Sequence, residues 1–136
     1  MSDTQTETRS VVIEREVPYP PEKIWRALTQ PHLIEEWLMK TDFKPVMDHR
    51  FRLTADWGDV DCQVTALEPN RMLAYRWDAM GLESLVTWTL TPTATGTSLR
   101  MEQTGFRPDQ EQAYQGARFG WQRFLGSLEE VLARLD

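Results

Sequence analysis

The side chains that could carry out nucleophilic chemistry are few and far apart in this sequence. The two histidines, His32 and His49, fall at the start of a predicted helix and in a predicted turn. The single cysteine, Cys62, alternates with Val60 and Val64, which is typical of an inward-facing strand position. Because a nucleophile needs a base beside it, this set predicts no catalytic pair. One cysteine also excludes an intrachain disulfide and a cysteine-based metal site.

Acidic residues gather at Asp56, Asp59 and Asp61, within one predicted hairpin. Carboxylates are calcium ligands, but this cluster lacks the bidentate Glu and the loop length of an EF-hand. The segment 32–36 holds one histidine and two glutamates and lacks the two-histidine spacing of a zinc-binding helix. We therefore predict no metal and no other cofactor, and interpret the three aspartates as a solvated turn.

Alternating apolar and polar residues predict a strand over 11–17 and about six further strands between 41 and 103. Residues that tolerate turn geometry separate them, at 48–49, 58–59, 69–70, 81 and 95–96. Such short connections favour an antiparallel meander, because parallel crossovers need longer links. The alternation places Glu83 and Glu102 on the outer face, so acid/base chemistry has no carboxylate pair in the interior.

Two short helices are predicted after the first strand, at about 21–29 and 31–38, each beginning at a proline. A long helix is predicted from about residue 109 to near the C-terminus. Its apolar residues fall within an arc of about 120°, so that this helix must cover the apolar face of the sheet. The predicted fold class is α+β, with an antiparallel sheet of six or seven strands and one long C-terminal helix.

Length and charge limit the classes of function. A chain of 136 residues is the usual size of one domain, which we place at 11–136 after a disordered tail at 1–10. The net charge of −6 and the scattered basic residues disfavour nucleic-acid binding. The sequence has neither a secretory signal nor the ~20 consecutive apolar residues of a membrane span. We therefore expect a cytoplasmic protein.

Two segments carry a family resemblance: PPEKIWRALTQPHLIEEWLM at 20–39 and GWQRFLGSLEEVL at 120–132. They resemble the homologue family of the activator of heat-shock-protein ATPase (AHSA-type), within the START-like, polyketide-cyclase-like (SRPBCC) superfamily. Segments 73–77, 86–92 and 104–106 fit as well. The resemblance implies a helix-grip fold, in which a curved sheet wraps around the long helix and leaves a cavity. The implied functions range from hydrophobic-ligand binding and polyketide cyclisation to chaperone stimulation in the stress response.

The predicted pocket lies between the first half of the long helix and the strand ends. Its candidate ligand-contacting residues are aromatic, polar and apolar side chains of the inner sheet face, the second short helix and the long-helix stripe: Trp37, Trp57, Tyr75, Trp77, Ser84, Met101, Gln103, Tyr114, Ala117, Arg118 and Trp121. Tyr75, Ser84 and Gln103 would orient the ligand, and Arg118 at the pocket mouth would meet an anionic group. The alternative, that the same indoles fill the cavity, remains open.

The leading hypothesis is a protein that binds a small apolar or amphipathic ligand, such as a lipid, without catalysis. One alternative is a cyclase or dehydratase type of enzyme acting on a polyketide-like or aromatic substrate, with Tyr75 as the acid. Another is an interaction module that contacts a chaperone. Phe119, an aromatic residue opposite the helix stripe, is the sequence feature that suggests such a contact or a homodimer. Gly116 and Gly120 lower helix propensity in the same half of the helix, which suggests that this half gates the pocket.

Overall fold

The structure is a computed structural model that describes residues 8–135. Seven strands form one antiparallel sheet in the order β1-β7-β6-β5-β4-β3-β2. The strands are β1 (Arg9–Val17), β2 (Lys40–Thr41), β3 (Arg50–Ala55), β4 (Gly58–Glu68), β5 (Met72–Ala79), β6 (Leu82–Pro92) and β7 (Thr97–Phe106). From β2 to β7 each strand lies beside the next one in the chain, so the predicted meander is confirmed. β1 returns to the far edge, beside β7.

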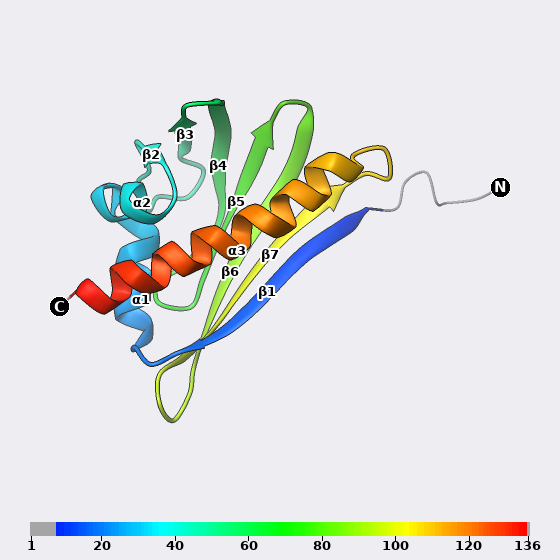
Figure 1. Ribbon diagram of the computed structural model, residues 1–136. Helices are drawn as coiled ribbons and strands as arrows, with labels where there is room; N and C mark the ends of the chain where they lie inside the picture. Colours follow the sequence, from blue (N-terminus) through cyan, green and yellow to red (C-terminus); the bar gives the residue numbers. More distant parts are fainter. Residues whose placement is uncertain (1–7, 136) are drawn as a thin grey trace.

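Three helices lie on the concave side of the sheet (Figure 1). They are α1 (Pro21–Thr29), α2 (Pro31–Trp37) and α3 (Glu111–Arg134). Gln30, between α1 and α2, is extended with φ −97° and ψ 120°, because the proline that follows disfavours helical geometry at the residue before it. The predicted α+β helix-grip fold is therefore confirmed. Within the described residues, no helix is both long enough and apolar enough to cross a bilayer.

The core lies between α3 and the inner face of the sheet. The buried side chains of α3 begin at Trp121, near the middle of the helix, and the other four lie in its second half: Leu125, Leu128, Val131 and Leu132. α1 and α2 flank this second half, whereas the first half of α3 extends past them toward the β5–β6 turn (Figure 1). One half of α3 is therefore enclosed on both sides, and the other half has β1 on one side only.

The first strand begins earlier than the sequence indicates. β1 starts at Arg9, inside the predicted tail, because Arg9 pairs with Phe106 of β7. Its guanidinium also forms an ion pair with Glu111 at the start of α3. Residues 1–7 of the predicted tail lie outside the described residues.

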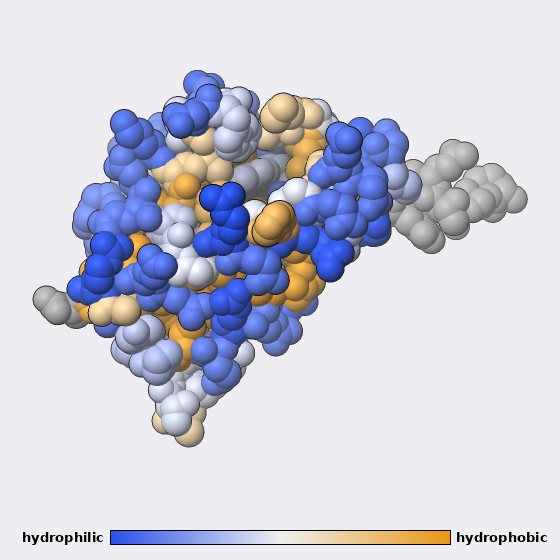
Figure 2. Space-filling model, in the orientation of Figure 1, coloured by the Kyte–Doolittle hydropathy of each residue, from blue (hydrophilic) through white to orange (hydrophobic). Residues whose placement is uncertain are grey.

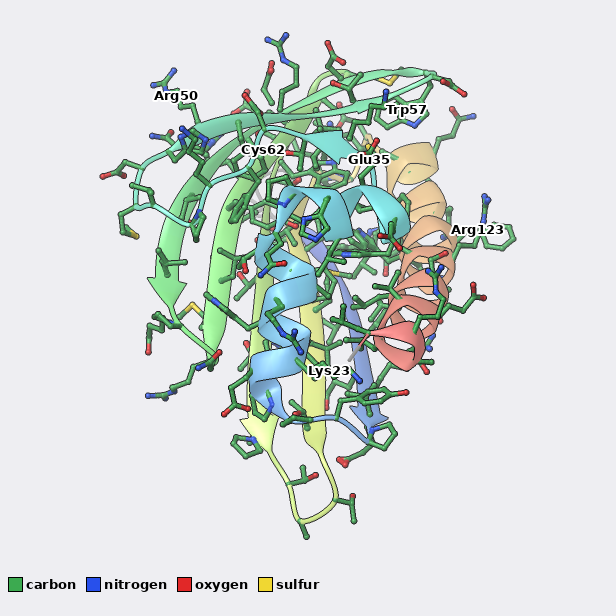
Figure 3. All side chains as sticks on the ribbon, turned by 90° about the vertical axis from the view of Figure 1, so that its left-hand side faces the viewer. Lys23, Glu35, Arg50, Trp57, Cys62 and Arg123 are labelled. Carbon is green, nitrogen blue, oxygen red and sulfur yellow. The ribbon has the colours of Figure 1, made fainter. Side chains whose placement is uncertain are left out.

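The β3–β4 turn differs from the prediction. Gly58 already belongs to β4 and pairs with Ala55, so the turn is at 56–57 and not at 58–59. Trp57 therefore leaves the apolar face that the alternation assigns to it and is 55% exposed. Figure 3 shows Trp57 at this turn, on the side of the sheet that faces the first turns of α3.

Candidate functional site

A chain of buried hydrogen bonds joins α3 to the centre of the sheet. The indole Nε1–H of Trp121 donates to Oε1 of Gln103 at 2.6 Å. Nε2 of Gln103 donates to Oγ of Ser84 at 2.9 Å, and this hydroxyl donates to the carbonyl oxygen of Trp77 at 2.6 Å. All four residues are buried. Loss of any one of these groups would leave its partner buried without a hydrogen bond, which is costly in a low-dielectric interior.

The strand register brings these groups together. Trp77 of β5 lies opposite Ser84 of β6, and Gln103 of β7 lies opposite Val86, two residues along from Ser84. The bond between Gln103 and Ser84 is therefore a diagonal cross-strand contact. Gly105 makes this approach possible, since it has φ 113° and a Cβ there would lie 2.7 Å from the carbonyl oxygen of Glu83.

Indole rings surround this polar chain. Trp121 contacts Trp77 at a ring-centroid distance of 5.2 Å and Trp88 at 5.8 Å. Trp88 in turn contacts Trp37 at 5.6 Å, edge to face. The Nε1–H of Trp37 donates to the carbonyl oxygen of Ala27 in α1, which ties the far end of the cluster to the helical layer. The aromatic wall is therefore continuous from α1 to the first buried turn of α3.

Tyr75 is a second buried polar group on the inner face. Its hydroxyl oxygen accepts a hydrogen bond from Nε1 of Trp88 at 3.1 Å, and its ring meets Phe51 edge to face. Among the described residues, no acceptor contacts the proton of this hydroxyl. Burial raises the pKa of Tyr75 well above its usual value, with a smaller opposing effect from the Trp88 hydrogen bond. The phenol is therefore neutral at physiological pH and has a donor proton to offer.

A hollow in the molecular surface lies beside the first half of α3 (Figure 2). Figure 2 shows the surface hollowed between this half of α3 and the β3–β4 and β5–β6 turns. Trp77 on the inner face of β5 is 8% exposed, whereas Trp57 at the β3–β4 turn is 55% exposed. A Cβ added at Gly116 or Gly120 would meet no atom within 4 Å, so this stretch of helix is loosely surrounded.

The predicted site residues fall into groups with different surroundings. The structure joins Trp77, Ser84, Gln103 and Trp121 directly by hydrogen bonds and ring contacts. Trp37, Tyr75 and Met101 are buried in the core around them, and Tyr114 and Ala117 are partly buried in the first half of α3. Trp57 is displaced from the inner face by the turn at 56–57, and Tyr114 lines the groove beside β1 together with Arg118. That the buried residues of this set contact a ligand stays a prediction.

Arg118 lies elsewhere. It is exposed on the side of α3 that faces β1, in a groove with Val12 and Phe119. Its guanidinium contacts Oε1 of Gln115 at 3.3 Å and lies 5.9 Å from the ring of Tyr114. The structure therefore does not bring Arg118 to the buried polar chain, and an anionic group bound there would need another partner.

Trp88 belongs to the buried cluster but is not among the predicted site residues. It donates to Tyr75 and contacts both Trp37 and Trp121. A signal for this role exists in the sequence, because Trp88 and Tyr75 are inward-facing on strands that the meander makes neighbours. A buried indole N–H usually finds an acceptor, and here the phenol of Tyr75 accepts it.

The aspartates of the β3–β4 hairpin have a different partner. Arg52 forms ion pairs with Asp59 at 3.8 Å and with Asp61 at 3.2 Å. In the part of the chain that the structure describes, no group of three or more His, Cys, Asp or Glu side chains is arranged to hold a metal ion.

Comparisons with known proteins agree with this architecture. Residues 18–133 match the family described as "Activator of Hsp90 ATPase homolog 1-like protein". The solved structure of protein MLL2253 from Mesorhizobium loti is 60% identical, with a TM-score of 0.91 over 94% of this chain and 99% of that one. A search of curated proteins gives no match.

Two further solved structures come from more distant proteins. DynU16, described as a protein in the dynemicin biosynthetic locus, is 30% identical with a TM-score of 0.82 over 91% of this chain. The alignment covers 47% of DynU16, so this chain spans about half of that protein. CalU16 from Micromonospora echinospora is 24% identical, with a TM-score of 0.81 over 92% of this chain and 76% of that one, and shares the fold.

Proposed function

This chain belongs to the activator of Hsp90 ATPase homolog 1-like family, and we propose that it binds a small, mostly apolar ligand between the first half of α3 and the sheet. The observation that carries the proposal is the hydrogen-bonded chain of Trp121, Gln103 and Ser84 within a wall of indoles. Small-molecule sites usually combine an apolar lining with a few fixed polar groups.

The arrangement also indicates which end of the ligand would lie where. Gln103 uses one amide hydrogen on Ser84 and keeps a second, and Tyr75 keeps its hydroxyl proton. Both are donors, so the ligand group nearest the sheet would be an acceptor such as a carbonyl. The apolar body would lie against the contacting rings of Trp77 and Trp121. The origin of DynU16 in a biosynthetic locus supports a small-molecule ligand for relatives of this fold.

Titration with the fluorescent probe N-phenylnaphthylamine tests the proposal. We expect saturable enhancement of its fluorescence and displacement of the probe by aromatic or acyl carbonyl compounds. Gln103→Met should weaken displacement by carbonyl compounds about tenfold, because it removes a buried donor. Gln112→Met makes the same change on an exposed position of α3 and should have no effect. If the folded protein binds neither the probe nor any carbonyl compound, the proposal is wrong.

A cyclase or dehydratase activity is the second candidate, and the free hydroxyl proton of Tyr75 is the observation that favours it. The second amide hydrogen of Gln103 would hold the carbonyl oxygen of the substrate, and a solvent water would take the proton from the α-carbon. The phenol of Tyr75 would protonate the β-hydroxyl, which leaves as water, and solvent would return the proton to the phenolate. Dehydration of a β-hydroxy ketone, followed by the absorbance of the enone product, is the test. Tyr75→Phe should abolish turnover and leave binding of N-phenylnaphthylamine intact. Equal turnover by both proteins would exclude Tyr75 as the acid.

A further inference from the structure

A groove on the other side of α3, beside β1, is separate from the ligand site. Its floor is the stretch 10–13 of β1, and its wall is formed by α3, including Tyr114, Arg118 and Phe119. In Figure 2, hydrophobic atoms reach the surface along the flank of α3 that faces β1. Val12 is 44% exposed and Phe119 is 72% exposed, so the groove has accessible apolar surface on both of its sides.

β1 presents unpaired backbone groups to this groove. It is an edge strand, paired with β7 alone. In an antiparallel pair, alternate residues turn their N–H and C=O groups away from the partner strand, so about half of those on β1 face outward. Natural edge strands are usually protected by charged side chains, prolines or bulges. The stretch Ser10-Val11-Val12-Ile13 has no charge and no proline, and the one irregularity of β1 lies before it, between Arg9 and Ser10.

Two ion pairs fix the width of the groove. Arg9 pairs with Glu111 at the start of α3, and Arg15 pairs with Glu129 and also donates to Oε1 of Gln122. These contacts join β1 to α3 at both ends of the groove. The space between the strand edge and the helix is therefore held by the fold and does not depend on an occupant.

The charge of the groove favours an acidic occupant. Arg118 is the only charged residue among those that line it, in a chain whose net charge is −6. Arg9 and Arg15 already contact carboxylates, whereas Arg118 contacts Oε1 of Gln115 and lies over the ring of Tyr114. The carboxylate of Glu111 is near enough to interact electrostatically with Arg118, but its hydrogen bonds go to Arg9 and Gln115. A carboxylate brought into the groove would complete a charge-assisted hydrogen bond.

We propose that the groove binds an extended acidic segment of another protein, which adds to the edge of β1 as an eighth strand. Its alternate side chains would then face α3, where a carboxylate meets Arg118 and an apolar side chain two residues away meets Phe119. The side chains between them would lie beside Val12 on the opposite face. Backbone hydrogen bonds provide the affinity in such strand addition, and the side chains that meet the helix provide the specificity.

A second copy of this chain is a poorer occupant. On β1 the residues that share the α3-facing side are Arg9, Val11, Ile13, Arg15 and Val17. None of them is acidic, so β1 of a second copy would offer arginine and no carboxylate to Arg118. Arg9 and Arg15 are moreover already paired with the α3 of their own chain.

The test uses a synthetic peptide, N-acetylated TVEVFVT amide, and the full chain labelled with ¹⁵N. We expect saturable binding with amide shift changes confined to 10–13 and 114–122. Replacing the glutamate by lysine (TVKVFVT) should weaken binding about tenfold, and Arg118→Glu should reverse the preference between the two peptides. N-methylation of alternate peptide bonds should abolish binding, because it blocks strand addition.

Other results would overturn the proposal. These are the absence of binding, equal affinity for both peptides, or shift changes centred on Trp77 and Gln103. Concentration-dependent dimerisation in sedimentation, with protection of the amides of 10–13, would instead identify a second copy as the occupant. Because the groove and the ligand site lie on different sides of α3, Gln103→Met should leave peptide binding unchanged.

Discussion

Gln103 is the residue on which the interior polar chain depends. Its amide accepts from the helix and donates to the sheet, so it links Trp121 to Ser84. The indole N–H of Trp121 and the hydroxyl of Ser84 lie on either side of Gln103. These two groups could find other hydrogen-bond partners only if the core rearranged. A single side chain at 1% exposure therefore connects α3 to the centre of the sheet.

Replacing Gln103 should lower the stability of the fold. Gln103→Met keeps the length of the side chain but leaves the indole N–H of Trp121 buried without an acceptor. We expect a loss of about 1–3 kcal/mol in the free energy of unfolding, measured by urea denaturation. Gln112→Met on the exposed face should change stability by less than about 0.5 kcal/mol. Equal effects of the two substitutions would contradict the role of the chain.

The raised pKa of Tyr75 allows a prediction of how the stability of the fold changes at high pH. Burial raises its pKa in the folded protein above the ordinary value, so the folded state keeps the phenol proton after the unfolded state has lost it. Its contribution to stability is complete below about pH 10 and is lost as pH rises above that value toward the folded pKa. Unfolding free energies between pH 8 and 12 should therefore fall less steeply in Tyr75→Phe than in the parent chain. Tyr114→Phe, at a partly buried position, is the matched control.

At the scale of elements, α3 has two halves with different surroundings. The second half carries four of the five buried side chains of the helix, and the fifth, Trp121, lies near its middle. The first half borders the hollow on one side and the β1 groove on the other. Gly116, Gly120 and Gly126 all face open space, so none of the three is required by packing. The glycines of the first half are the ones that lie beside the proposed ligand site.

Replacing each of these glycines by alanine tests the stability of the helix and the proposed gating separately. Gly116→Ala, Gly120→Ala and Gly126→Ala should each raise the free energy of unfolding by about 0.5–1 kcal/mol, since alanine favours the helix and meets no atom. If the first half gates the site, only the first two should also slow the release of N-phenylnaphthylamine in stopped-flow measurements. Similar release rates for all three variants would exclude the gate.

Replacing Gly105 by alanine should have the opposite effect on the stability of the protein. Its φ of 113° is unfavourable for any residue with a Cβ, and a Cβ there would lie against the backbone of Glu83. Gly105→Ala should therefore destabilise the protein by more than the about 1 kcal/mol that the helix substitutions add. Thermal unfolding of the four variants under one condition compares them directly.

The elements were predictable because their periodicities are clear, but their relative orientation was not. Alternation along β5–β7 correctly placed Trp77, Ser84 and Gln103 on one face. Arg118 lies at the edge of the helix stripe, and a stripe has two edges. Which edge faces β1 depends on how α3 is rotated against the sheet, and this is set by contacts distant in sequence, such as Arg15 with Glu129. Trp57 was misplaced because Asp56 and Trp57, not Gly58, make the turn.

At the scale of the molecule, one core joins the sheet and all three helices. We therefore expect a single cooperative unfolding transition, in which tryptophan fluorescence and far-ultraviolet circular dichroism change together. Midpoints in urea that coincide for the two signals would support one cooperative unit over 11–136. A fluorescence change that precedes the loss of secondary structure would instead show that the open half of α3 detaches first.

The contact of Trp121 with Trp77 and Trp88 has an optical consequence. Ring centroids 5.2 and 5.8 Å apart are close enough for the electronic transitions of the indoles to couple, which produces paired bands of opposite sign in circular dichroism. Trp121 belongs to α3, whereas Trp77 and Trp88 belong to the sheet. The intensity of that exciton couplet therefore reports the position of the helix over the sheet, without any label added to the protein.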